Sequence, residues 1–76
     1  MRRYAIGQFV VYTGQHPMLP FGSTLLLVDH VDVAYDVEQG RMVPRPGRAY
    51  DLQVDDVRSL AVDEFDIASV EEFKWH

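Results

Sequence analysis

The residue types that most often carry out chemistry in proteins are few in this chain and loosely spaced. The segment Asp29-His30-Val31-Asp32 places three candidate metal ligands within four residues. In an extended segment, His30 and Asp32 share a face while Asp29 points away from it. A structural zinc site normally has four ligands. We therefore interpret this segment as a polar loop after a strand and predict no metal site.

A second group of carboxylates lies in the last third of the chain. Its spacing does not match an EF-hand loop, which needs alternating oxygen ligands and a central glycine. Glycosidase chemistry needs two carboxylates held across a cleft, for which 76 residues leave little room. We interpret these acids as helix caps and a solvated acidic face. They are Asp55, Asp56, Asp63, Glu64 and Asp66.

Nucleophiles and phosphate-binding loops are missing from the sequence. It has no cysteine, which excludes disulfides, thiolate metal sites and a cysteine nucleophile. Its serines do not lie in a Gly-x-Ser-x-Gly elbow, and its glycines form no phosphate-cradling loop. We predict a protein that is not an enzyme and needs no cofactor. The absence of cysteine fits a reducing, cytoplasmic setting.

The elements that would position any site are short and rich in β-forming residues. The length allows one domain, residues 1–76. Runs rich in Val, Leu, Tyr and Thr alternate with Gly and Pro, which is typical of an all-β chain. The longest apolar run has four residues, so we expect no membrane span. The predicted strands cover residues 8–13, 24–29, 33–38 and 49–54.

Two turns are predicted between these strands. Glycine at the second position of Gln39-Gly40 suits a two-residue hairpin turn, which would place Val37 opposite Met42. The segment Pro44-Arg45-Pro46-Gly47 should then end the returning strand, because proline removes a backbone donor.

The last third contains two helical signals. Asp55 can cap one helical turn near residues 55–60. Residues 61–67 are compatible with either a final strand or a turn. Ser69 and Glu72 have the spacing of a capping box, which predicts a short C-terminal turn.

This order of elements resembles a Src-homology-3-like small β-barrel of the broad Tudor and KOW type. The segments that carry the resemblance are residues 7–12, Gly22, residues 35–40 and residues 50–60. The resemblance covers roughly residues 7–67 and is one of architecture rather than of motif. It implies a mainly β, five-stranded barrel. No functional residue can be assigned from the resemblance, because the aromatic pairs of a peptide groove or a methyl-lysine cage are not recognisable.

Candidate interface residues lie in three places. The loop of residues 14–22 carries three large apolar side chains on a segment that two prolines keep out of a regular ladder, and long loops in small domains are often functional. The same side chains could instead cover an open end of the barrel. The candidates are Met18, Leu19 and Phe21 in this loop, Arg41, Arg45 and Arg48 beyond the hairpin turn, and Trp75 near the chain end.

Charge is distributed unevenly. The net charge is −5, but residues 39–50 carry +3 and residues 51–73 carry −7. Three hypotheses fit this pattern. The first is a non-catalytic module that binds and regulates or inhibits a larger protein, as accessory proteins of phages and bacteria do, with homodimer formation as a further option. The second is single-strand nucleic-acid binding, which the net charge disfavours. The third is an acidic face that mimics nucleic-acid phosphates.

Overall fold

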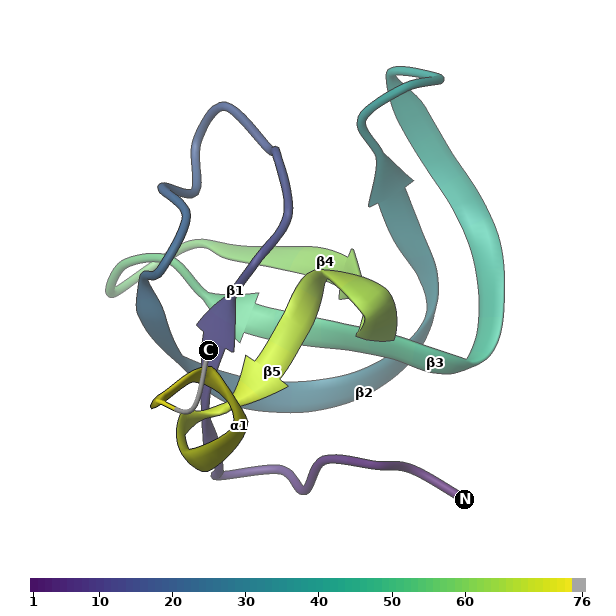
Figure 1. The fold of residues 1–76 in the computed structure, drawn as a ribbon. Helices are drawn as coiled ribbons and strands as arrows, with labels where there is room; N and C mark the ends of the chain where they lie inside the picture. Colours follow the sequence, from purple (N-terminus) through teal and green to yellow (C-terminus); the bar gives the residue numbers. More distant parts are fainter. Residues whose placement is uncertain (75–76) are drawn as a thin grey trace.

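The computed structural model describes residues 1–74, which form one strongly curved antiparallel sheet (Figure 1). The sheet order is β4-β3-β2-β1-β5, and within these residues its edges do not close into a ring. The prediction of a mainly β, five-stranded domain is confirmed. The elements of this part of the chain are β1 (Phe9–Tyr12), β2 (Thr24–Asp36), β3 (Arg41–Gln53), β4 (Ser59–Asp63), the 3₁₀ helix η1 (Glu64–Asp66), β5 (Ile67–Ser69) and α1 (Val70–Lys74).

The hydrophobic core fills the inside of the curved sheet. Tyr12 of β1 and both Tyr50 and Leu52 of β3 are at most 1% exposed. Val11 points to the outer face of β1 and is still buried, because α1 packs against that strand. A strand covered on both faces reads as a continuous apolar run, which explains the pattern at residues 8–13.

Strands β2 and β3 are longer than the strands predicted from the sequence. Residues 29–32, predicted as a loop, continue β2. Residues 44–47, predicted to end a strand, lie inside β3. Register shifts between Leu27 and Asp29 and between Val31 and Val33 interrupt the ladder. Such bulges let a strand continue past residues that fit a regular ladder poorly.

The β2–β3 hairpin also differs from the prediction. Met42 pairs with Tyr35 rather than with Val37, so the loop has four residues instead of two. The carbonyl oxygen of Asp36 accepts from the backbone N–H of Gly40 at 2.8 Å. Gly40 has φ +67°, which only glycine adopts readily, so it closes the longer loop.

The helical turn predicted near residues 55–60 is wrong. These residues form a tight turn, and β4 already begins at Ser59. The carboxylate of Asp55 accepts from the backbone N–H groups of Val57 at 3.0 Å and Arg58 at 2.9 Å. The capping bonds expected of Asp55 therefore form, but they close a β-turn because β3 and β4 pair directly on either side.

Residues 61–67, which were compatible with a strand or a turn, contain both: β4 ends at Asp63, η1 covers residues 64–66 and β5 begins at Ile67. Asp63 is the N-cap of η1, and its carboxylate accepts from the N–H of Phe65 at 3.1 Å. The capping box before α1 forms as predicted. The backbone N–H of Glu72 donates to the hydroxyl of Ser69 at 3.0 Å, and Ser69 N–H donates to the Glu72 carboxylate at 3.2 Å.

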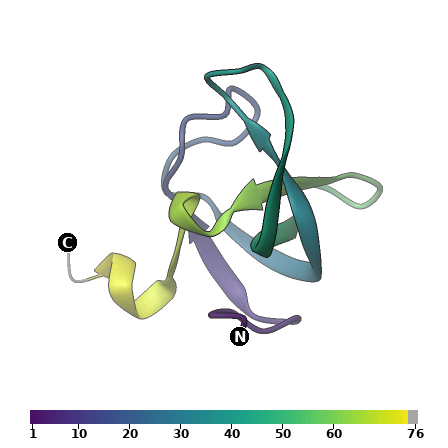
Figure 2. The same ribbon diagram turned by 90° about the vertical axis from the view of Figure 1, so that its right-hand side faces the viewer.

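Different segments of the chain lie at the two ends of the curved sheet. The β1–β2 loop (residues 13–23) and the β2–β3 hairpin rise together on one side, which we call the cleft end (Figures 1 and 2). Residues 1–8 cross the opposite side, which we call the closed end (Figure 1). Helix α1 stands out from the sheet in Figure 2.

Candidate functional site

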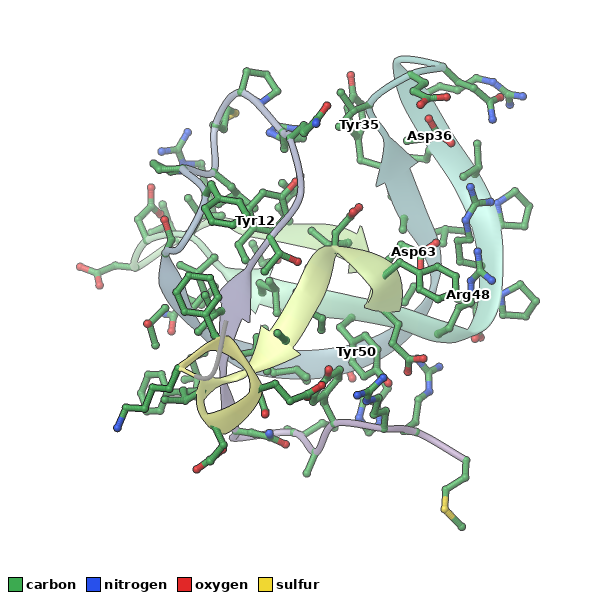
Figure 3. All side chains as sticks on the ribbon, in the orientation of Figure 1. Tyr12, Tyr35, Asp36, Arg48, Tyr50 and Asp63 are labelled. Carbon is green, nitrogen blue, oxygen red and sulfur yellow. The ribbon has the colours of Figure 1, made fainter. Side chains whose placement is uncertain are left out.

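A cleft of about 430 Å³ opens between the β1–β2 loop and the β2–β3 hairpin. Figure 3 shows Tyr35 and Asp36 on the hairpin side of this space, with Asp63 below them. Residues from four separate segments reach it, so it exists only in the folded chain. Its lining includes Thr13, Gly14, Tyr35, Asp36, Glu38, Arg45, Asp63 and Asp66.

An ion-pair network forms the wall of the cleft. The Nε of Arg45 donates to Asp63 at 2.8 Å, and a terminal nitrogen of Arg45 donates to Asp36 at 3.2 Å. Arg48 donates to the same Asp63 oxygen at 3.0 Å. The Asp63 side chain is 14% exposed, so these charges are partly desolvated. The network links the hairpin to the start of η1.

Asp66 also lines the cleft, and neither arginine of this network forms an ion pair with it. Burial raises the pKa of Asp66 above its ordinary value, and the negative charges of Asp63 and Asp36 raise it further. The Arg45 guanidinium opposes this shift. Ionised Asp66 therefore lies in a negative, partly buried environment that an additional cation would stabilise.

Backbone geometry holds the loop close to Asp66. A Cβ added to Gly14 would clash with the Tyr12 hydroxyl and lie 2.9 Å from Asp66 Cγ, so any larger residue would force these side chains to move. The Tyr12 hydroxyl accepts from the His16 N–H at 2.8 Å. The loop thus enters the cleft at a fixed position above the core.

Aromatic rings meet at the rim of the cleft. His16 from the loop and Tyr35 from the hairpin pack edge to face, with ring centroids 4.9 Å apart. This contact spans from one side of the cleft to the other. Tyr35 is also part of the cleft lining, so it can offer a ring to a bound group.

The three apolar candidates of the β1–β2 loop separate in the structure. Leu19 is 3% exposed and belongs to the core, whereas Met18 and Phe21 are 53% and 69% exposed. The Phe21 ring lies 5.8 Å from that of Phe73 in α1. Met18 borders a second, apolar hollow of about 500 Å³ beside the β3–β4 turn. The loop therefore both covers the core and exposes apolar surface.

The arginine candidates are not gathered into one basic patch. Arg45 and Arg48 are bonded to carboxylates, and the Cζ of Arg48 lies 4.9 Å from the ring centroid of Phe65. Arg41 lies at the start of β3 and donates to Gln39 at 2.7 Å. Trp75, the remaining candidate, lies outside the described residues.

The candidate metal segment serves a structural role instead. The Nε2 of His30 lies 2.7 Å from the backbone oxygen of Tyr4, and its ring packs against Tyr50. Asp29 accepts from the His30 N–H at 2.9 Å. In residues 1–74, no three histidine or acidic side chains are arranged to hold a metal ion.

The closed end was not foreseen from the sequence. The Tyr50 ring is fully buried, and its hydroxyl donates to Glu64 at 2.7 Å and accepts from the Arg3 N–H at 3.0 Å. The Arg3 guanidinium pairs with Glu72 at 2.6 Å. The basic pair at residues 2–3 was the available signal, but its acceptors lie far away in the sequence.

The comparisons with known proteins do not place the chain in a family. No family model matches it, and no curated protein or solved structure is significantly similar to it. No helix within residues 1–74 is long and apolar enough to cross a membrane.

Proposed function

We propose that this protein is a small non-catalytic interaction module that binds a basic segment of a protein partner in the cleft and so regulates or inhibits that partner. One observation carries the proposal. Among the described residues that line the cleft, the carboxylates are Asp36, Glu38, Asp63 and Asp66, against the single guanidinium of Arg45. A concave, negatively charged surface selects a positively charged partner and speeds its association.

The cleft already binds a guanidinium from its own wall. Arg45 lies between Asp36 and Asp63, at hydrogen-bonding distance from both. Asp66 lies in the same cleft, where burial and then the negative charges of Asp63 and Asp36 raise its pKa and so disfavour its ionised form. A partner's lysine or arginine beside Asp66 would supply a compensating positive charge, and the Tyr35 ring could pack against its side chain.

The arrangement of elements supports the Src-homology-3-like interpretation as part of this proposal. The long loop after β1, the β2–β3 hairpin and a helical turn before the last strand agree with the order on which the resemblance rests, although this turn lies at residues 64–66 and not near residues 55–60. A scaffold of this kind presents loops at one end of a rigid sheet. Binding residues in many proteins lie on such loops.

The other two hypotheses receive less support. Nucleic-acid binding needs cations available for phosphate, yet Arg45 and Arg48 pair with carboxylates. A phosphate mimic needs its carboxylates on one surface. Asp55 instead lies in the β3–β4 turn bonded to Arg58, and Glu72 lies in α1 bonded to Arg3.

A titration with a blocked tetra-arginine peptide, followed by amide chemical shifts, tests the proposal. We expect the shifts to group around the cleft, at Thr13, Gly14, Tyr35 and Asp66. Asp66→Asn should weaken binding about tenfold, as expected for the loss of one partly desolvated charge pair.

Asp56→Asn is the matched control, because Asp56 is exposed in the β3–β4 turn and its replacement changes the net charge equally. Equal losses in the two variants would reduce the effect to net charge and contradict a cleft site. Shifts on another face would also contradict it. Binding of an oligothymidylate at about 50 mM salt would favour the nucleic-acid hypothesis instead.

A further inference from the structure

The pairing of β2 with β3 is interrupted at one large bulge. Val31 pairs with Ala49 and Val33 pairs with Pro44, so β2 advances two residues while β3 advances five. The extra backbone belongs to residues 45–48, which we call the bulge. A bulge leaves peptide groups that the ladder itself cannot pair.

The side chain of Arg2 supplies partners at this position. Its guanidinium donates to the backbone oxygen of Ala49 at 2.6 Å, to that of Val31 at 3.0 Å and to the Asp32 carboxylate at 3.2 Å. Its Cζ lies 5.5 Å from the ring centroid of Tyr50. The side chain is only 21% exposed, so Arg2 is part of the sheet structure rather than a solvated charge.

Asp32 extends this arrangement to the bulge itself. The Oδ1 that accepts from Arg2 also accepts from the backbone N–H of Gly47 at 3.1 Å. Gly47 has φ +76°, so the bulge turns sharply there. From the first residue of the bulge, Arg45 reaches Asp63 and Asp36 in the cleft wall. Continuous contacts therefore join the closed end to the cleft end.

We propose that Arg2 is a positioning residue for the cleft. By bonding both strands at one end of the bulge, and the Asp32 carboxylate that accepts from Gly47 N–H, Arg2 fixes the backbone from which Arg45 reaches Asp63. Arg45 in turn holds the hairpin at a set distance from η1 and thereby preorganises the cleft. This inference rests on the proposed function, because it assigns Arg2 a role in binding of the basic partner.

The first measurement needs no ligand. The Nε–H of Arg45, bonded to Asp63, should exchange slowly with solvent in the native protein. In Arg2→Ala its exchange should accelerate about tenfold, a size typical of coupling through a packed network. Arg3→Ala is the matched control, since Arg3 lies in the same segment but pairs with Glu72 instead. It should leave the exchange unchanged.

The second measurement is the affinity for the tetra-arginine peptide. Arg2→Ala should weaken it about tenfold through lost preorganisation, and Arg3→Ala should not. Arg2→Lys keeps the charge but lacks the planar fork, so it should restore folding without restoring Arg45 Nε–H protection. This variant keeps the inference testable if Arg2→Ala does not fold.

Equal exchange and equal affinity in the Arg2 and Arg3 variants would overturn the inference. Full protection of the Arg45 Nε–H in Arg2→Lys would overturn it too, because charge alone would then suffice. If the native protein does not bind the peptide at all, the proposed function is wrong. A positioning effect of Arg2 on Arg45 is then judged by the exchange rates alone.

Discussion

The closed end and the cleft end use the same residue types with opposite results. At the closed end, Tyr50 is fully buried with its hydroxyl bonded on both sides. At the cleft end, Tyr35 packs edge to face on His16 and also faces the cleft. The Arg2 guanidinium bonds two backbone oxygens of strands β2 and β3 and one carboxylate, whereas that of Arg45 bonds two carboxylates and the backbone oxygen of its neighbour Pro44.

The difference arises from which segment covers each end. Residues 1–8 cross the closed end and bring donors to buried acceptors there (Figure 1). At the cleft end, the loop and the hairpin stand apart, so carboxylates remain at a water-accessible surface. Polar groups that the chain itself satisfies stabilise the fold, while polar groups left in an open cleft are available to a partner.

The largest expected effect separates the two tyrosines. Tyr50→Ala should lower the free energy of unfolding by about 3–5 kcal/mol, since it empties a fully buried aromatic site. Tyr35→Ala should lower it by about 1 kcal/mol, the worth of one aromatic pair. Urea denaturation of both variants makes the comparison. A similar loss in the two would show that the cleft end is as closely packed as the closed end.

An intermediate effect separates two residues of the β1–β2 loop. Leu19→Ala should lower the free energy of unfolding by about 2–5 kcal/mol, because Leu19 is buried in the core. Phe21→Ala should lower the free energy of unfolding by less than about 1 kcal/mol, because the ring is mostly exposed. Thermal unfolding measures both stabilities, and a titration with the peptide measures affinity. A loss of affinity confined to Phe21→Ala would assign its ring to recognition, and a stability loss equal to that of Leu19→Ala would assign it to packing.

The smallest expected effect depends on pH and concerns Asp66. The pKa of Asp66 is raised in the folded state above its ordinary value of 3.8. The free energy of unfolding should therefore fall as the pH rises from 3.8 through the folded-state pKa, because Asp66 ionises less readily in the fold than in the unfolded chain. Asp66→Asn should remove this decrease and stabilise the protein near neutral pH, by less than about 1 kcal/mol because solvent screens the carboxyl.

Below the ordinary pKa, the stability difference between the variant and the native protein should vanish, since both side chains are then uncharged. Urea unfolding from about pH 3 to about pH 7 measures it. A variant that is less stable near neutral pH would show that the Asp66 carboxylate is compensated in the fold, and the cleft would then offer no anchor for a cation.

Local patterns were predicted where short-range interactions decide the structure. The capping box of Ser69 and Glu72 forms because both partners lie within one helical turn. Asp55 makes its expected backbone bonds, but the neighbouring strands decide that these close a β-turn rather than a helix. The hairpin loop is longer than predicted because glycine can close either loop length.

The candidate site was predicted only in part. Arg45 and Arg48 were named as candidate interface residues, but their pairing with Asp63 was not foreseen. The acids of the last third were interpreted as helix caps and a solvated face. Asp63 does cap η1, but Asp63 and Asp66 also line the cleft, which carboxylates separated in the sequence do not indicate. The contacts of Arg2 could not be predicted from the basic pair at residues 2–3, because its acceptors lie about 30 or more residues away in the chain.

The sequence by itself determined the β class, the exclusion of cysteine chemistry in these residues and the uneven charge. Composition and short-range periodicity fix these properties whatever the tertiary arrangement. Only the tertiary structure decided which acids face the cleft, which arginines are neutralised and which tyrosine is buried. Those outcomes depend on segments distant in the chain meeting at one bulge and one hairpin, and their register is set by packing of the whole sheet.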